Sequence, residues 1–114
     1  MNIRIFLLIF FMSSSIYSEE NFGIVVHGGA GVMTGLSDET KEQMHQKIQE
    51  TVSKAYLILD KGGSSLDAVE LAVSMLEDSP LFNAGKGSVY NSDEVQEMDA
   101  SIMDGEKRLA GAVA

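Results

Sequence analysis

The chain has 114 residues, with 17 acidic and 8 basic side chains and a formal net charge of −9 at pH 7. This excess of acidic groups argues against a nucleic-acid partner, because phosphates have to be neutralised by Lys and Arg. The chain contains no cysteine, which excludes disulfide bonds and thiolate chemistry, so packing alone must hold the fold.

Residues 1–18 are typical of an export signal. A short positive region with Arg4 precedes an apolar run over residues 5–12, and small polar residues follow up to Ser18. The apolar run is far shorter than the ~20 residues that cross a bilayer, so we expect no stable membrane span. We predict cleavage after Ser18 and a periplasmic or secreted product of residues 19–114; an anchor that is never removed is the alternative.

The next segments predict a strand followed by a long helix. Residues 23–27 are apolar and β-branched, which indicates a short, fully buried strand. Ser37 is a suitable helix cap, and the Gly62-Gly63 pair should end the helix because glycine readily adopts the left-handed conformation. Apolar residues recur at steps of three and four, which places on one face Met44, Ile48, Val52, Ala55 and Leu59.

A second helix is predicted to start at Ser64 or Ser65. It should end before Pro80, because the residue before a proline avoids the helical region. Helical spacing groups its apolar side chains on one buried face. That face comprises Leu66, Val69, Val73 and Leu76, widened by Leu71, Ala72 and Met75.

The last third of the chain predicts strands. A short strand can begin at Val89, and residues 96–103 and 109–114 read as two more. The Asp104-Gly105 pair between them is a turn signal. The final apolar strand runs to the last residue without a turn or a polar tail, so we expect the chain to continue beyond it.

Residues 27–31 (His-Gly-Gly-Ala-Gly) form the first candidate for a site. Glycines let the backbone approach a partner closely, so a structural turn, a loop of a functional site and an anion cradle are all open. The cradle for a nucleotide is the weakest of these, since neither a Lys-Ser/Thr pair nor an immediate helix follows. Asn83 alone reads as a turn residue. The carboxylates Glu94, Glu97, Asp99 and Asp104 read as structural or surface groups, although Glu97 and Asp99 share one face of the predicted strand and could work as an acid–base pair.

Four motifs follow one another along the chain: Val26–Gly31, Gly62–Val69, Pro80–Val89, and Met98–Gly105 with Ala110–Ala114. In this order they resemble the first half of the threonine-type isoaspartyl peptidase/L-asparaginase family of N-terminal-nucleophile hydrolases. The resemblance implies an α/β (α+β) fold, the four-layer αββα sandwich of that family, of which only the first part is present. Residues 19–114 would be the amino-terminal part of the large-subunit (α) region, before the nucleophile.

The resemblance implies an amidohydrolase that releases L-aspartate from isoaspartyl dipeptides and L-asparagine. Its nucleophile would be an N-terminal threonine exposed by self-cleavage, and the chain's own Thr34, Thr40 and Thr51 lack the expected Gly-Thr-Val-Gly context. The threonine would therefore lie beyond this chain, which alone should be inactive. A glycosylasparaginase-like hydrolase is one alternative; a non-catalytic exported module that binds through its glycine loop, or a decayed family member, is another.

The same resemblance implies roles for particular residues. His27, Gly28 and Gly29 would lie near the catalytic centre, with His27 as a positioning group, and Asn83 would hydrogen-bond near the nucleophilic threonine. No cofactor for chemistry is implied, and the partners would be a small-molecule substrate and a second chain, in αβ pairs that assemble as a dimer of heterodimers. A structural sodium ion is implied, held by the main-chain carbonyls of Leu76, Glu77, Ser79, Phe82, Ala84 and Lys86.

Overall fold

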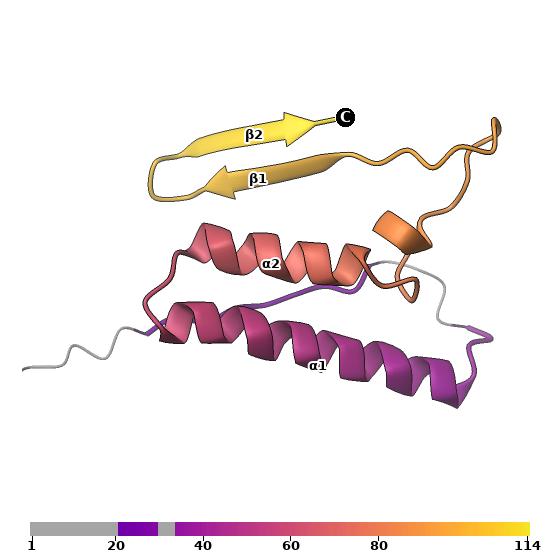
Figure 1. The fold of residues 1–114 in the computed structure, drawn as a ribbon, viewed down its shortest axis with the longest axis horizontal. Coiled ribbons are helices and arrows are strands. Elements are labelled where there is room, and N and C mark those ends of the chain that lie inside the picture. The colour runs from indigo at the N-terminus through magenta and orange to yellow at the C-terminus, as the bar shows by residue number, and fades with distance from the viewer. Residues whose placement is uncertain (1–20, 30–33) are drawn as a thin grey trace, which may run out of the picture.

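The computed structural model of the chain describes residues 21–29 and 34–114. The predicted export signal, and the Ala30-Gly31 end of the glycine motif, lie outside the described residues. Two antiparallel helices form one layer, and a two-stranded antiparallel sheet lies on the far side of the second helix (Figure 1). The elements are α1 (Asp38–Asp60), α2 (Ser65–Glu77), the 3-10 turn η1 (Gly85–Gly87), β1 (Ala100–Asp104) and β2 (Leu109–Val113).

Helix α1 begins and ends where the sequence predicts. The Ser37 hydroxyl accepts a hydrogen bond from the Thr40 N–H at 3.1 Å, which satisfies one of the free donors at the helix start. At the other end, Gly62 adopts a positive φ of 79° and its N–H donates to the Leu59 carbonyl at 2.9 Å. Glycine makes this reversal without steric cost, and the chain turns back into α2.

Helix α2 also has its predicted limits. Ser64 caps it: its hydroxyl accepts from the Asp67 N–H at 3.1 Å and donates to the Asp67 carboxylate at 2.7 Å. The helix ends at Glu77, ahead of Pro80, as expected from the restriction that a proline places on the preceding residue.

The two helices pack through their smallest side chains. Ala55, Ala68 and Ala72 are buried at this contact, and small residues let two helix backbones approach closely. The predicted buried face of α2 is therefore wrong in part: Val69 and Val73 lie outside the contact and are 43% and 46% exposed.

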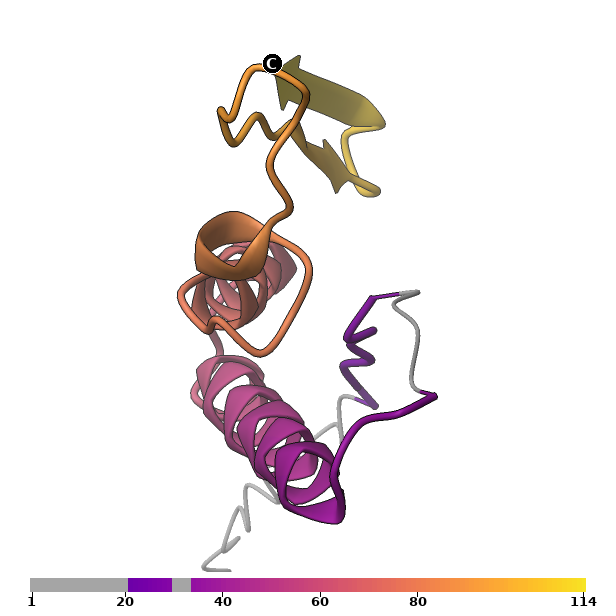
Figure 2. The same cartoon turned by 90° about the vertical axis from the view of Figure 1, so that its right-hand side faces the viewer.

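Residues 21–29 run lengthwise beside the two helices, at the level of their contact (Figure 1 and Figure 2). Ile24 and Val26 pack against the alanine core, whereas Val25 points away and is 96% exposed. The prediction of a fully buried strand here is thus wrong. The segment is extended, with one face covered by helices, and no strand of the described residues pairs with it.

The sheet is a hairpin with a simple register. Ala100 lies opposite Val113 and Asp104 opposite Leu109. The Asp104 carboxylate accepts from the N–H groups of Glu106 and Lys107 at 3.0 and 3.2 Å, which builds the predicted turn. The first strand is shorter than predicted, because residues 96–99 have no strand opposite them.

The predicted strand at Val89 is absent from the part of the chain that the structure describes, since this segment leads into a turn. That turn is closed by Asn91, whose N–H donates to the Val95 carbonyl at 2.9 Å. The helices form one layer and the sheet another, which confirms the expected α/β class; the described residues form part of such a fold. Within residues 21–29 and 34–114, no helix has the length and apolarity needed to cross a bilayer.

Candidate active-site region

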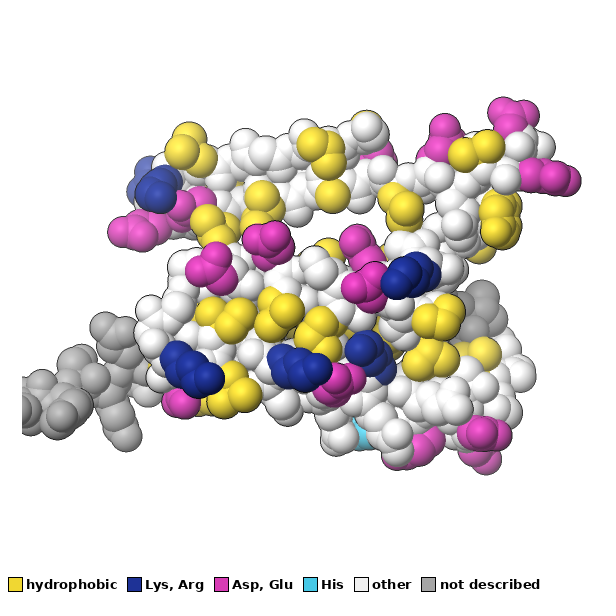
Figure 3. All heavy atoms as spheres, in the orientation of Figure 1, with side chains coloured by type: hydrophobic (Ala, Val, Ile, Leu, Met, Phe, Trp, Pro, Cys, Tyr) yellow, Lys and Arg dark blue, Asp and Glu magenta, His cyan; other side chains and the backbone are white. Residues whose placement is uncertain are grey.

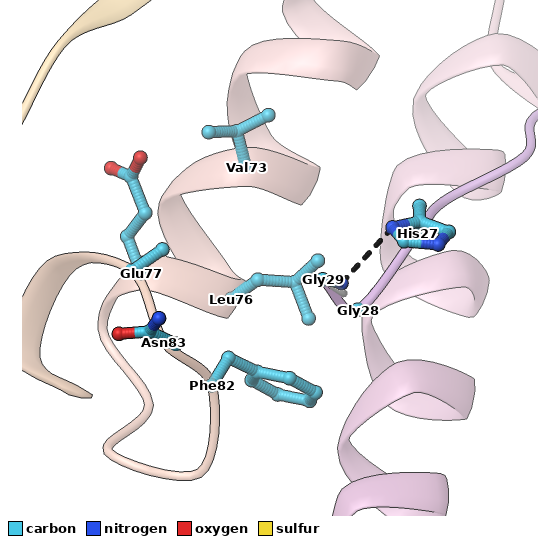
Figure 4. Close-up of a pocket in the computed structure, with 9 residues that line it drawn as sticks. His27, Gly28, Gly29, Val73, Leu76, Glu77, Phe82 and Asn83 are labelled. Atoms are coloured by element: carbon cyan, nitrogen blue, oxygen red, sulfur yellow. Dashed lines mark hydrogen bonds between the residues drawn. The ribbon is translucent and has the colours of Figure 1, made fainter. Parts of the chain in front are cut away.

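A half-open cavity of about 170 Å³ lies where residues 21–29 meet the end of α2 and the loop that follows it (Figure 4). It brings residues 27–29 of the glycine motif together with Asn83, which is more than fifty positions further along the sequence. The side chains of Leu76 and Phe82 point toward Gly28 and Gly29 and form its apolar floor (Figure 4). The lining residues are His27, Gly28, Gly29, Val73, Leu76, Glu77, Phe82, Asn83 and Ala84.

The two glycines of this cavity are needed for different reasons. A Cβ atom on Gly28 would stand 3.1 Å from Ile48 Cδ1 and 3.1 Å from Phe82 Cε1, so the backbone touches side chains that a larger residue would displace. Gly29 has open space around it but a φ of 98°, which side chains rarely permit. Close approach at one position and backbone conformation at the next together shape this wall of the cavity.

His27 holds the glycine turn rather than facing the cavity floor. Its Nδ1 atom accepts a hydrogen bond from the Gly29 N–H at 3.1 Å, and its exposed ring lies on the far side of Gly29 from Leu76 (Figure 4). This geometry suits the positioning role implied by the sequence resemblance, because the imidazole fixes the backbone of the turn.

Asn83 is anchored at one end of its amide. Its Oδ1 atom accepts from the Val89 N–H at 3.1 Å, which fixes the side-chain orientation through the loop that follows. An amide also carries two N–H donors on its nitrogen. The arrangement can therefore present a fixed hydrogen-bond donor beside the cavity.

No hydroxyl or thiol side chain lines the cavity within the part of the chain that the structure describes. Thr34 lies in the turn before α1, and the Thr40 hydroxyl is hydrogen-bonded to Ser37 at 2.8 Å. Thr51 is fully buried in α1. The described residues that line the cavity thus include an amide side chain but no hydroxyl or thiol.

The loop that was predicted to hold sodium folds back onto the end of α2. We refer to residues 76–86 as the carbonyl loop. A Cβ on Gly85 would overlap the Glu77 carbonyl oxygen, and a Cβ on Gly87 would overlap the Phe82 carbonyl oxygen, so only glycine allows this close backbone contact. Both glycines belong to the Pro80–Val89 motif of the sequence, whereas these backbone contacts become visible only in the folded loop.

The carbonyl loop has the donor chemistry that a hard cation requires. Leu76 O accepts from the Ser79 N–H and Ala84 O from the Gly87 N–H, each at 3.1 Å. The other four predicted ligand carbonyls, those of Glu77, Ser79, Phe82 and Lys86, accept no hydrogen bond from the described residues. Unpaired carbonyl oxygens at a helix end fit a cation bound through oxygen.

An ion pair crosses the carbonyl loop. The Lys86 ammonium lies 2.9 Å from the carboxylate of Asp78, the residue that directly follows α2. The hydrogen bond from Lys86, together with its positive charge, lowers the pKa of Asp78 below its ordinary value. The charge of Lys86 is therefore balanced by Asp78 rather than left beside the predicted cation.

The carboxylates that the sequence assigned to structural roles do not line the cavity. Glu97 accepts from the Asn91 amide at 2.7 Å, and Asp104 organises the hairpin turn and pairs with Lys107 at 3.4 Å. Asp99 lies just before β1.

Comparison with known proteins identifies the class. A family described as asparaginase matches residues 20–114, so the chain belongs to the asparaginase family. It is 54% identical over 91 residues to an isoaspartyl peptidase/L-asparaginase of Macaca fascicularis. The matched residues make up 80% of this chain and 29% of that protein.

Two further relatives extend the comparison. The human isoaspartyl peptidase/L-asparaginase is 52% identical over 91 residues, covering 80% of this chain and 29% of the relative. An isoaspartyl peptidase of Salmonella typhimurium is 45% identical over 93 residues, covering 80% of this chain and 30% of the relative. The chain thus spans less than a third of the length of these curated relatives.

Proposed function

We propose that this chain is the amino-terminal part of an amidohydrolase that releases L-aspartate from isoaspartyl dipeptides and from L-asparagine. The observation that carries the proposal is the cavity in which the glycine motif and Asn83 meet. Family membership and relatives named isoaspartyl peptidase/L-asparaginase support the same activity.

The proposed nucleophile is a threonine outside residues 1–114, exposed as a new amino terminus when the protein cleaves its own backbone. Its α-amine, with a pKa near 8, would take the proton of the hydroxyl as the oxygen attacks the amide carbon. The amine product then leaves with a proton, and water hydrolyses the resulting ester to release aspartate. The absence of a hydroxyl side chain from the cavity lining of the described residues is consistent with a nucleophile from elsewhere.

Residues of this chain would support that chemistry without performing it. Asn83 would hydrogen-bond beside the threonine through its amide, since its oxygen is already fixed by the Val89 N–H. His27, Gly28 and Gly29 would shape the opposite wall and position the segment that is cleaved. A sodium ion bound by the carbonyl loop would fix the loop that carries Asn83.

The proposed assembly follows from the cleavage. The two chains that it produces would stay together as an αβ pair, and two pairs would form a dimer of heterodimers. Export to the periplasm or the medium, directed by residues 1–18, is part of the same proposal. Those residues lie outside the described part of the chain.

The decisive experiment is intact-mass measurement and N-terminal sequencing of the protein purified from its native source. We expect two chains, the second beginning with threonine. A single chain that ends at Ala114 would contradict the proposal and favour an exported binding module. Rates of aspartate release from an isoaspartyl dipeptide, L-asparagine and a glycosylated asparagine would then separate the isoaspartyl peptidase from the glycosylasparaginase-like alternative.

A further inference from the structure

The carbonyl loop brings its two arms together at the backbone. The first arm is the end of α2, and the second is η1, which follows Asn83. Gly85, with a φ of 54°, lies against the Glu77 carbonyl, so the second arm touches the first at a carbonyl that is a proposed sodium ligand.

The side chains add a second connection at the same place. Asp78 lies between the proposed ligands Glu77 and Ser79, and Lys86 is itself one of the proposed ligands on the other arm. Their ion pair at 2.9 Å therefore joins the two arms that carry the proposed ligand carbonyls. The two side chains are 71% and 67% exposed, so their contribution to global stability is small.

We propose that the Asp78–Lys86 ion pair is a clamp that holds the carbonyl loop closed before a cation binds. Asp78 and Lys86 are positioning residues: they act on the carbonyl oxygens and on Asn83 through the backbone of the loop. This inference rests on the proposed sodium site, but its structural part concerns the order of the loop without the ion. A pre-closed loop loses less conformational freedom on binding, so its affinity is higher than that of an open loop.

A simple charge effect predicts the opposite result for one substitution. Lys86→Met removes a positive charge beside the proposed cation, which by Coulomb's law alone should tighten sodium binding. The clamp predicts weaker binding, because the loop opens. The exchanged pair Asp78→Lys with Lys86→Asp keeps the contact and the net charge, so it should restore the native behaviour.

The first measurement is amide hydrogen exchange of residues 82–90 in sodium-free buffer at low ionic strength, with the protein as its gene encodes it. Lys86→Met is expected to exchange roughly 2- to 5-fold faster at Gly87 and Ser88, whose N–H groups bond to loop carbonyls, and the exchanged pair at the native rate. Lys54→Met, which removes an ion pair from α1, is the matched control and should leave this segment unchanged. Equal exchange in Lys86→Met and the native protein would overturn the clamp.

The second measurement is the sodium concentration that half-saturates the rise in melting temperature, with choline chloride holding ionic strength constant. We expect a roughly 2- to 5-fold higher value for Lys86→Met and a native value for the exchanged pair. Tighter or unchanged sodium binding in Lys86→Met would overturn the role of the clamp in binding. A native protein that does not respond to sodium would instead refute the proposed sodium site, while hydrogen exchange still tests the clamp itself.

Discussion

The helical layer and the hairpin of this molecule are ordered in different ways. In the helical layer, Ala55, Ala68, Ala72 and Phe82 are buried where α1, α2 and residues 21–29 pack together. In the hairpin, every residue of β2 is exposed, and large apolar side chains lie open to solvent (Figure 3). The helices are therefore held by packing, and the hairpin by its backbone ladder and its turn.

The two regions also differ in how much of their apolar surface is covered. Apolar residues occur on both faces of the hairpin, as in strands that are covered on both sides. Within the described residues, α2 alone among the helices contacts the hairpin. A substitution in the helical layer should therefore change the free energy of unfolding, whereas an equivalent substitution in the hairpin should change it little.

The largest difference is expected between a methyl group added in η1, which folds back onto the helical layer, and one added in the hairpin. Gly87→Ala places a Cβ against the Phe82 carbonyl and 2.8 Å from the Pro80 carbonyl, and both obstacles are backbone. We expect the free energy of unfolding to fall by about 3 kcal/mol, measured by urea denaturation.

The matched control for Gly87→Ala is Gly105→Ala in the hairpin turn. A Cβ at Gly105 meets no atom within 4 Å, and its backbone does not have a positive φ. Its effect should stay within about 0.5 kcal/mol. Equal losses at the two glycines would contradict the contrast between the regions.

The next effect is stabilising and concerns the core of the helical layer. Thr51 is fully buried in α1, and its hydroxyl has no hydrogen-bond partner among the described residues. Because a buried hydroxyl without a partner is costly, Thr51→Val should raise the free energy of unfolding by about 1–2 kcal/mol. Thr40→Val is the control: it loses the hydroxyl contact with Ser37, and thermal unfolding should show no gain.

A smaller effect is expected at the start of α2. Ser64→Ala removes the hydroxyl that caps the Asp67 N–H, so we expect a loss of about 1 kcal/mol in the free energy of unfolding. Ser53→Ala is a suitable control, because the Ser53 hydroxyl bonds to the Gln49 carbonyl inside α1, where no free donor depends on it. A similar loss for both variants in chemical denaturation would argue against the cap.

The helical layer could be predicted from sequence because its signals are local. Ser37, Ser64, the Gly62-Gly63 pair and Pro80 fix the helix limits through their nearest neighbours. The buried face of α2 could not be predicted as well, since helical spacing favours its larger valines, whereas the close approach of two helices selects alanines. Which stripe is buried depends on the partner helix.

The same reasoning applies to the strands and to the candidate site. A buried strand was predicted at residues 23–27 from composition, but a sheet needs a neighbour, and the described residues hold none for it. That His27 and Asn83 lie near one another was predicted from the family resemblance, because their spacing in the sequence does not indicate it. The close contacts of Gly85 and Gly87 depend on how the loop folds back, which no local pattern states.

The smallest effect should appear when acid weakens the ion pairs of α1. The hydrogen bond from Lys54 at 2.6 Å, followed by that from Lys47 at 3.2 Å, lowers the pKa of Glu50 below its ordinary value of 4.5. A carboxylate with a lowered pKa in the folded protein stabilises it above the unfolded pKa, and this contribution is lost as the pH falls through the lowered value. Glu50→Gln should therefore flatten the loss of thermal stability between pH 5 and pH 3 by a small amount, since exposed pairs are weak.

Glu106→Gln in the hairpin turn, which removes no ion pair of the described residues, should leave the pH profile unchanged. The difference between the two variants should shrink in ~1 M salt, because screening acts on exposed charges, and a difference that persists there would mean that packing of the side chain is responsible instead.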